Sequence, residues 1–116
     1  MSANLPATAF KILTAGQWDA WKSDTIFHGA PVDLADGFIH LSGADQLSET
    51  ATKHFAGQTG LILAEIDLAM LGDAVKWEPS RGGALFPHVY APISLSAILE
   101  VKPIDDPVRS PATASE

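Results

Sequence analysis

The sequence predicts a single α+β domain with a mixed or antiparallel sheet and two main helices. Its 116 residues suffice for one modest hydrophobic core. Several short apolar segments have strand character, only two segments show helical spacing, and the two kinds do not alternate as β-α-β units. The domain is expected over residues 8–102, between a loose N-terminus at 1–7 and a disordered tail at 103–116 rich in Pro, Asp, Ser, Thr and Ala.

Composition restricts the partners and the compartment. The net charge is −7 and the basic residues form no cluster, which argues against a nucleic-acid-binding surface. No apolar run is long enough to cross a membrane, and residues 1–6 lack the features of a secretory signal, so a cytoplasmic protein is expected. The absence of cysteine excludes disulfides and thiolate chemistry. A small-molecule or protein partner is favoured, and nothing in the sequence indicates an oligomeric state.

The chain begins with a predicted strand and helix. Residues 9–13 form an apolar strand, and Thr14 with Gln17 has the spacing of a capping box that opens a helix. Trp18 and Trp21 would share one face of that helix. Both are most simply core anchors, with ligand stacking by one of them as the alternative.

The segment between the first helix and the central strand is expected to be irregular. Residues 24–36 have little regular potential, because Pro31 interrupts them and Asp33 and Asp36 suit a turn. The pair Asp36-Gly37 is typical of the turn that leads into the next strand.

Residues 38–42 form the central strand of the prediction. Side chains alternate along a strand, so Ile39 and Leu41 would point one way and His40 and Ser42 the other. A helix is expected over 43–56, with Ser42 as its cap. This arrangement places an imidazole beside a helix N-terminus, where an anion is favoured. The alternative for His40 is a core histidine with a single hydrogen bond.

The second half of the chain supplies most of the predicted strands. The apolar run at 60–67 indicates a central strand covered on both faces, followed by a helical turn at 68–72. Residues 74–78 alternate as a strand, and 86–92 are expected to form an edge strand because they contain prolines. A last strand is predicted at 98–101.

Polar side chains from three of these segments could meet in one site. His40 and His88 are the candidate catalytic residues, because imidazole serves as a general acid or base near neutral pH. The candidate ligand-binding residues on the same segments and the adjoining glycine loop are Ser42, Glu78, Arg81 and Tyr90. The expected ligand is a small anionic molecule. No metal site is expected, since the histidines lack the close spacing of metal ligands.

Each of these residues also has an ordinary reading. Tyr90 would be a half-buried packing residue, and Glu78 and Arg81 would be solvated charges. If the two histidines, Arg81 and Tyr90 converge in one cleft, the case for an active site gains ground. If His88 packs in the core, that case loses ground.

The motifs resemble one protein family closely. The stretches Asp36-Gly37-Phe38-Ile39-His40-Leu41-Ser42 and Phe86-Pro87-His88-Val89-Tyr90-Ala91-Pro92-Ile93, with Gln46 and Trp77-Glu78 between them, are similar to a small bacterial family catalogued as domain of unknown function 952. The resemblance covers the chain from about Phe10 to Val101. The family name brings no established activity.

A more distant resemblance is to the ADP-ribosyltransferase fold and its tRNA 2′-phosphotransferases. It rests on three stretches taken in order: Phe27-His28-Gly29-Ala30, His40-Leu41-Ser42 and Glu65-Ile66-Asp67. The resemblance implies a split sheet around a cleft for an NAD-like dinucleotide, with His28 and Gly29 on the adenosine side and His40 and Ser42 inside. Ala30 stands where those enzymes have threonine.

Two functions follow as hypotheses. The first is a small-ligand-binding protein that takes an anionic or nucleotide-like metabolite. The alternative is an enzyme of the ADP-ribosyl-transfer or phosphoryl-transfer type that acts on a small molecule.

Overall fold

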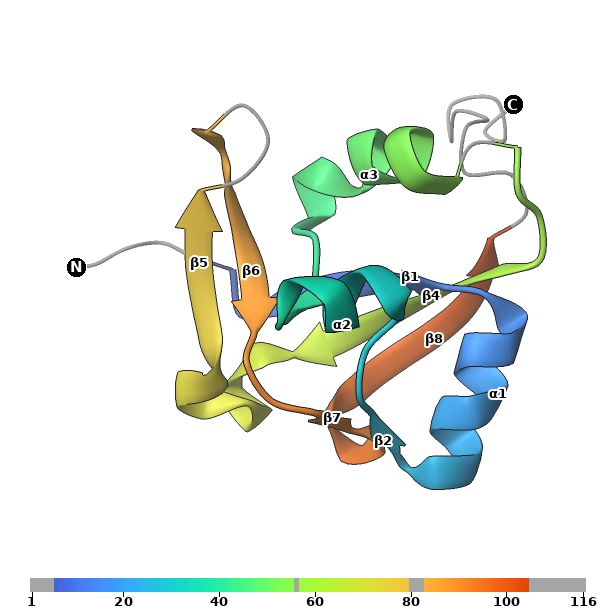
Figure 1. The fold of residues 1–116 in the computed structure, drawn as a ribbon, viewed down its shortest axis with the longest axis horizontal. Helices are drawn as coiled ribbons and strands as arrows, with labels where there is room; N and C mark the ends of the chain where they lie inside the picture. The colour runs from blue at the N-terminus through green and yellow to red at the C-terminus, as the bar shows by residue number, and fades with distance from the viewer. Residues whose placement is uncertain (1–5, 56, 80–82, 105–116) are drawn as a thin grey trace.

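The computed structural model describes residues 6–55, 57–79 and 83–104 (Figure 1). Most of the predicted C-terminal tail lies outside these ranges. Within them the helices are α1 (Ala15–Asp24), α2 (Pro31–Asp36) and α3 (Leu47–Phe55). The strands are β1 (Thr8–Leu13), β2 (Ile26–Phe27), β3 (Ile39–His40), β4 (Leu61–Asp67), β5 (Val75–Pro79), β6 (Leu85–Val89), β7 (Ile93–Ser94) and β8 (Ile98–Ile104).

The described strands form antiparallel sheets, which confirms the predicted α+β class with a split sheet. The strand orders are β1-β4-β8, β3-β6-β5 and β2-β7. The segment that follows β3 joins the two larger sheets. Ser42 exchanges two backbone hydrogen bonds with Phe10 of β1, and the N–H of Leu41 donates to Pro87 O of β6. The residues after His40 therefore lie between β1 and β6.

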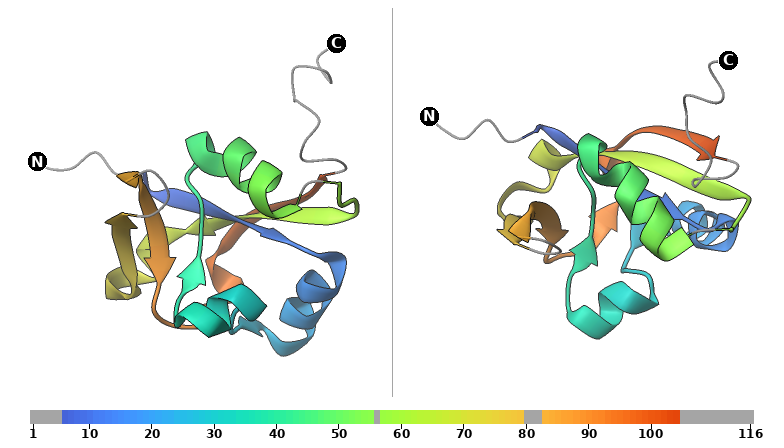
Figure 2. Two further views of the ribbon diagram at one scale, coloured as in Figure 1. Left: turned by 45° about the horizontal axis from the view of Figure 1, so that its top comes forward. Right: turned by 90° about the horizontal axis from the view of Figure 1, so that it is seen from above.

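β4 is the buried central strand that its apolar run predicts. On one face, Leu61 packs with Ile12 and with Ala51 of α3. On the other face, Ala64 and Ile66 belong to the main core, which also contains Trp21. Figure 2 shows α3 lying over the β1–β4–β8 sheet, with α2 on the opposite side of the molecule. Among the described residues, no helix is long and apolar enough to cross a membrane.

The first helix follows its sequence signals. Thr14 Oγ1 accepts the N–H of Gln17, and Gln17 Oε1 accepts the N–H of Thr14, so the capping box is complete. Trp21 is buried and its ring stacks on Phe27 with 4.8 Å between the ring centroids, while Trp18 meets Trp21 edge to face. These contacts make both tryptophans core anchors.

The prediction that residues 24–36 are irregular is wrong. They contain β2 and the short helix α2, and Pro31 begins that helix instead of interrupting it. Proline is well tolerated in the first turn of a helix, where its missing N–H would have no helical partner. Asp33 lies in that turn, and its Oδ2 accepts the N–H of Ala30 at 2.7 Å. Gly37 ends the helix with φ +89°, a left-handed conformation that favours glycine.

Two further predictions about element ends are corrected by the hydrogen bonds. Ser42 does not cap a helix: its Oγ contacts Thr50 Oγ1 at 2.9 Å. The helical segment begins instead with a 3-10 turn after Gly43, whose N–H donates to Gln46 Oε1 at 2.8 Å. α3 itself starts at Leu47. The prediction that Ser42 starts a helix and creates an anion site beside His40 is therefore wrong.

The prolines of this segment predicted an edge strand, but β6 is the middle strand of its sheet. It pairs with β5 on one side and with β3 on the other. Pro87 O accepts the N–H of Leu41, but Pro87 has no N–H to return that bond. The ladder with β3 accordingly ends at His40. At the C-terminal boundary, β8 runs through Ile104, so Pro103 and Ile104 belong to the sheet and not to the predicted tail.

Candidate functional site

The two candidate histidines lie side by side on neighbouring strands. His40 of β3 is paired directly with His88 of β6 in the antiparallel register. Directly opposite residues point to the same face of a sheet, and the two ring centroids are 5.5 Å apart with the planes at 73°. The alternation that puts Ile39 into the core turns His40 to the other face. The strand pairing therefore brings together two residues that are distant in the sequence.

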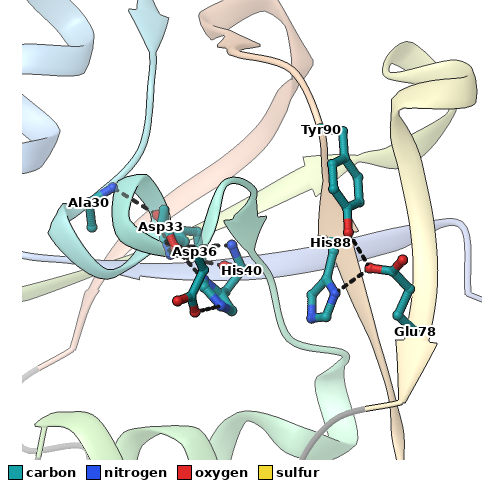
Figure 3. A network of polar contacts seen from close by, with 8 residues as sticks. Ala30, Asp33, Asp36, His40, Glu78, His88 and Tyr90 are labelled. Atoms are coloured by element: carbon teal, nitrogen blue, oxygen red, sulfur yellow. Dashed lines mark hydrogen bonds and ion pairs between the residues drawn. The ribbon is translucent and has the colours of Figure 1, made fainter.

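His40 is held between two carboxylates, as Figure 3 shows. Its Nδ1 lies 2.6 Å from Asp33 Oδ1, and its Nε2 lies 3.0 Å from Asp36 Oδ2. A neutral imidazole has one donor and one acceptor nitrogen, whereas the protonated ring has two donors. Both contacts are hydrogen bonds only when both ring nitrogens carry protons. The geometry therefore suits an imidazolium at His40.

Asp33 is the buried acceptor around which this part of the site is built. Its side chain is 1% exposed and also accepts the backbone N–H groups of Ala30 at 2.7 Å and His40 at 3.1 Å. Lys11 Nζ lies 3.0 Å from Asp33 Oδ2 and donates to His40 O at 2.9 Å. Burial alone would raise the pKa of Asp33, but the lysine ammonium and the surrounding N–H donors outweigh it and lower the pKa below its ordinary value.

His88 has a different carboxylate partner on the other side of the site. Its Nδ1 lies 2.7 Å from Glu78 Oε1, and the phenol of Tyr90 donates to the same oxygen at 2.7 Å. The hydrogen bonds from Tyr90 and His88 lower the pKa of Glu78 below its ordinary value. The hydrogen bond to Glu78 raises the pKa of Tyr90, because an ionised phenol could no longer donate it and would also set two negative charges together. His88 itself is buried, with 5% of its surface exposed.

Phe38 connects the two halves of the site. Its ring stacks on His88 with centroids 4.1 Å apart, and it contacts the His40 ring at 4.6 Å and the Tyr90 ring at 5.2 Å. An aromatic ring in contact with three others restricts their rotamers. Phe38 therefore fixes the relative position of the two histidines.

His40 and His88 line the same cavity. This larger cavity has a volume of about 470 Å³, which is in the range of small-molecule sites. Its lining combines residues of β1, α1, α2, β3, α3 and β6, and includes Phe10, Lys11, Gln17, Pro31, Val32, Asp36, His40, Ser42, Thr50, Phe55, Phe86 and His88. A smaller cavity of about 240 Å³ is lined by His28, Asp33, Leu34, Phe38, Tyr90 and neighbouring residues.

The predicted site residues are only partly brought together. His40, Ser42 and His88 line the larger cavity, and Glu78 contacts His88. Tyr90 and the exposed His28 line the smaller cavity, while Gly29 lines neither. Arg81 lies outside the described residues.

The dinucleotide cleft implied by the transferase resemblance stays a prediction. That resemblance places His28 on the adenosine side and Ser42 inside the cleft. In the structure His28 lines the smaller cavity and Ser42 lines the larger one.

Sequence reasoning missed four residues that build the site: Lys11, Asp33, Asp36 and Phe38. Two signals could have found the buried pair. A lysine inside an apolar strand is almost never buried without a partner, so Lys11 implied a buried carboxylate. An acidic residue two positions after a proline indicates a helix start, which places Asp33 in the first turn of α2. No comparable signal distinguished Phe38 from a core residue.

The arrangement offers proton-transfer and hydrogen-bonding chemistry in a partly apolar cavity. Both ring nitrogens of His40 contact carboxylates, whereas His88 contacts its carboxylate partner through Nδ1. In the described part of the chain, no group of three or more His, Cys, Asp or Glu side chains is placed to hold a metal ion.

Comparison with known proteins gives a family and a set of solved structures. Residues 12–101 match the family model described as "Protein of unknown function (DUF952)". The crystal structure of protein CC0527 from Caulobacter crescentus is 48% identical, with a TM-score of 0.82 over 84% of this chain and 86% of that one. The solution NMR structure of CC0527 is 47% identical, with a TM-score of 0.77 over 86% of each chain. No curated protein matches this chain.

Proposed function

We propose that this chain, which belongs to the DUF952 family, binds a small anionic metabolite in the larger cavity. The single observation that carries the proposal is the pairing of His40 with His88 at one cavity of about 470 Å³, each ring oriented by its own carboxylate. Side chains held this firmly in a concave site are what specific recognition of a small ligand requires.

Asp36 indicates where the anionic group of the ligand would sit. Its carboxylate is 49% exposed and contacts His40 Nε2 at 3.0 Å, and both residues line the larger cavity. A carboxylate or phosphate of the ligand would take the place of Asp36 on this nitrogen. Asp33, which is buried and bound to Nδ1, would stay in place and keep the ring oriented.

The rest of the cavity suits the less polar part of such a metabolite. Phe10, Phe55 and Phe86 line it, and aromatic side chains accept the flat face of a base or sugar. Gln17 and the Ser42–Thr50 hydroxyl pair supply neutral hydrogen-bonding groups at the same surface. These walls support an anionic ligand of nucleotide-like type over a simple inorganic ion.

A thermal-shift screen with adenine and nicotinamide nucleotides and sugar phosphates tests the proposal. A ligand that binds only the native state stabilises it by about 2.7 kcal/mol at 100 times its Kd. We expect at least one nucleotide or sugar phosphate to raise the Tm in a concentration-dependent way. If no compound raises the Tm at millimolar concentration, the proposal fails.

The Asp36→Asn variant tests where the anionic group binds. Removing a carboxylate that competes for His40 should tighten binding about two- to five-fold, which corresponds to the 0.5–1 kcal/mol of an exposed ion pair. Asp73→Asn, at another exposed carboxylate, is the matched control and should leave the Kd unchanged. Equal affinities for the Asp36→Asn variant and wild type would place the anion elsewhere.

A further inference from the structure

The Glu78 contact selects one tautomer of His88. A carboxylate accepts hydrogen bonds only, so the 2.7 Å contact with Glu78 Oε1 requires the proton on Nδ1. Nε2 of the neutral ring then carries the lone pair. Among the side chains that the structure describes, no hydrogen-bond partner of Nε2 is found, and His88 lines the larger cavity. Figure 3 shows this nitrogen on the side of the ring away from Glu78, so the ring carries an unshared basic nitrogen that we assign to the proposed ligand.

We propose that His88 is a general base that removes a weakly acidic proton from the ligand bound in this cavity. The proposal rests on the ligand binding proposed above and adds a reaction class, proton abstraction from an O–H group or from a C–H group next to a carbonyl. The His88 Nε2 lone pair takes the proton, and the electron pair of the broken bond stays on the ligand as an alkoxide or enolate. No oxidant, reductant or co-reactant is needed.

The surroundings of His88 match the charges that this step creates. The proton that arrives at Nε2 makes the ring an imidazolium, and its Nδ1–H donates to the Glu78 carboxylate. Tyr90 donates to the same carboxylate oxygen and thereby fixes its position. The negative charge forms on the ligand beside His40, whose geometry suits a second imidazolium at 5.5 Å between ring centroids. Glu78 and Tyr90 are positioning residues, since they act through His88.

A carbon-acid probe tests the base without knowledge of the natural ligand. Nitrobenzisoxazole is flat and small enough for the cavity. A base removes its ring C–H proton, the C–H electron pair forms a nitrile, and the N–O bond breaks to give a coloured phenolate. Positioned general bases contribute about 100-fold or more. We expect the full-length protein to open the probe about 100-fold faster than its His88→Gln variant, with a slower reaction for the probe deuterated at that carbon.

Variants at Glu78 separate positioning from folding. Glu78→Gln keeps an oxygen that accepts the Nδ1 proton but loses the charge, whereas Glu78→Ala loses both. We expect rates in the order wild type, Glu78→Gln, Glu78→Ala. Glu100→Ala, at an exposed glutamate of β8 outside both cavities, is the matched control and should react like wild type. Equal rates for Glu78→Ala and wild type would overturn the role of Glu78.

Chemical modification keeps the test decisive if His88 variants do not fold. Diethyl pyrocarbonate acylates accessible neutral imidazole nitrogens, and peptide mass spectrometry locates the label. In the wild-type protein, the loss of rate should follow the labelling of His88. A rate that survives complete labelling of His88, or a wild-type rate no faster than His88→Gln, overturns the proposal. If, after either of these results, a screened nucleotide or sugar phosphate still raises the Tm of the wild-type protein, the proposed ligand binding stands and only the base chemistry fails.

Discussion

Asp33 joins three segments of the site, because its carboxylate accepts from Lys11 on β1, from Ala30 before α2 and from His40 on β3. Lys11 is 8% exposed and Asp33 is 1% exposed, so both charges have left water. A buried pair of this kind is weak evidence for net stability, because desolvation opposes the attraction. Removing one partner is costly, however, since the other charge stays buried without compensation.

Asp33→Asn is therefore expected to destabilise the protein strongly. The variant leaves the ammonium of Lys11 buried without its counter-charge and should lower the free energy of unfolding by about 3–5 kcal/mol. Urea denaturation followed by circular dichroism measures the change. Asp19→Asn, at an exposed carboxylate that forms a surface ion pair with Lys22, is the control and should change stability by less than about 0.5 kcal/mol. A loss of similar size in both variants would contradict the account.

The pH dependence of stability gives a second test of Asp33. Its pKa is lowered in the folded state, so its contribution is present above the unfolded-state pKa and is lost as pH falls through the folded pKa. Below about pH 4, wild type should lose stability more steeply than Asp33→Asn. Other carboxylates are common to both proteins, so the difference between their curves isolates Asp33. Parallel acid-denaturation curves would show that the group titrates alike in both states.

Tyr90 permits an unusually direct measurement, because it is the one tyrosine in the sequence. Its pKa is raised by the hydrogen bond to Glu78, so the phenol should titrate above about 10, the value of a free tyrosine. Ultraviolet titration follows this ionisation without interference from a second phenol. In Glu78→Gln the pKa should fall back toward the ordinary value. An unchanged titration in that variant would mean that the Tyr90–Glu78 bond does not form in solution.

At the scale of elements, α2 depends on the two glycines that flank it. Gly29 has φ +128°, and a Cβ placed there would lie 3.0 Å from the Cβ of Asp33. Gly37 has φ +89°, but a Cβ there would meet no atom within 4 Å. Gly29 is therefore favoured both by its backbone conformation and by lack of space, whereas Gly37 is favoured by its backbone conformation alone.

Substitutions at these glycines are expected to differ. Gly37→Val should cost roughly 1–3 kcal/mol through backbone strain alone. Gly29→Ala should cost stability through strain and also displace Asp33, which would disturb the ring of His40. Gly16→Ala in α1, where nothing crowds the added methyl group, should stabilise by about 0.4–1 kcal/mol. Urea denaturation gives the energies and histidine NMR signals report the site. An unchanged His40 signal in Gly29→Ala would show that a side chain at position 29 does not disturb the His40 ring through Asp33.

Sequence patterns predicted the elements whose signals are local. The capping box at Thr14, the apolar run of β4 and the alternation in β5 all describe what happens within one segment. The sequence pattern does not predict α2, because a proline usually breaks a helix, whereas Pro31 stands at a helix start, where proline is favoured. The position of β6 in the middle of its sheet depends on which strands pair with it. Pro87 and Pro92 carry no information on that pairing.

The site was predictable to the extent that it follows strand alternation. Alternation puts the side chains of His40 and Ile39 on opposite faces of their strand. It puts His88 and Tyr90 on one face of the next, so the faces of these side chains follow from the sequence. The pairing of His40 with His88 and the cavity they share depend on long-range contacts. The participation of Asp33 and Phe38 depends on packing between elements, which a single sequence does not express.

At the scale of the whole molecule, the larger cavity lies where several elements meet. β1, α2, α3 and β6 all contribute to its lining, and the segment after β3 crosses between the two larger sheets beside it. A ligand held there would contact elements that are separate in the sequence. Its binding should therefore stabilise the domain as a unit, and the thermal transition should stay single while moving to higher temperature.

The central claim is that His40 and His88 face one ligand together. Long-range proton–nitrogen NMR spectra of the histidine rings test it directly during titration with the nucleotide or sugar phosphate that raises the Tm most. We predict that the ring signals of His40 and His88, assigned with His40→Gln and His88→Gln, shift together and give the same Kd. Movement of only one ring, or no movement of either ring at saturating ligand, would contradict a shared binding site.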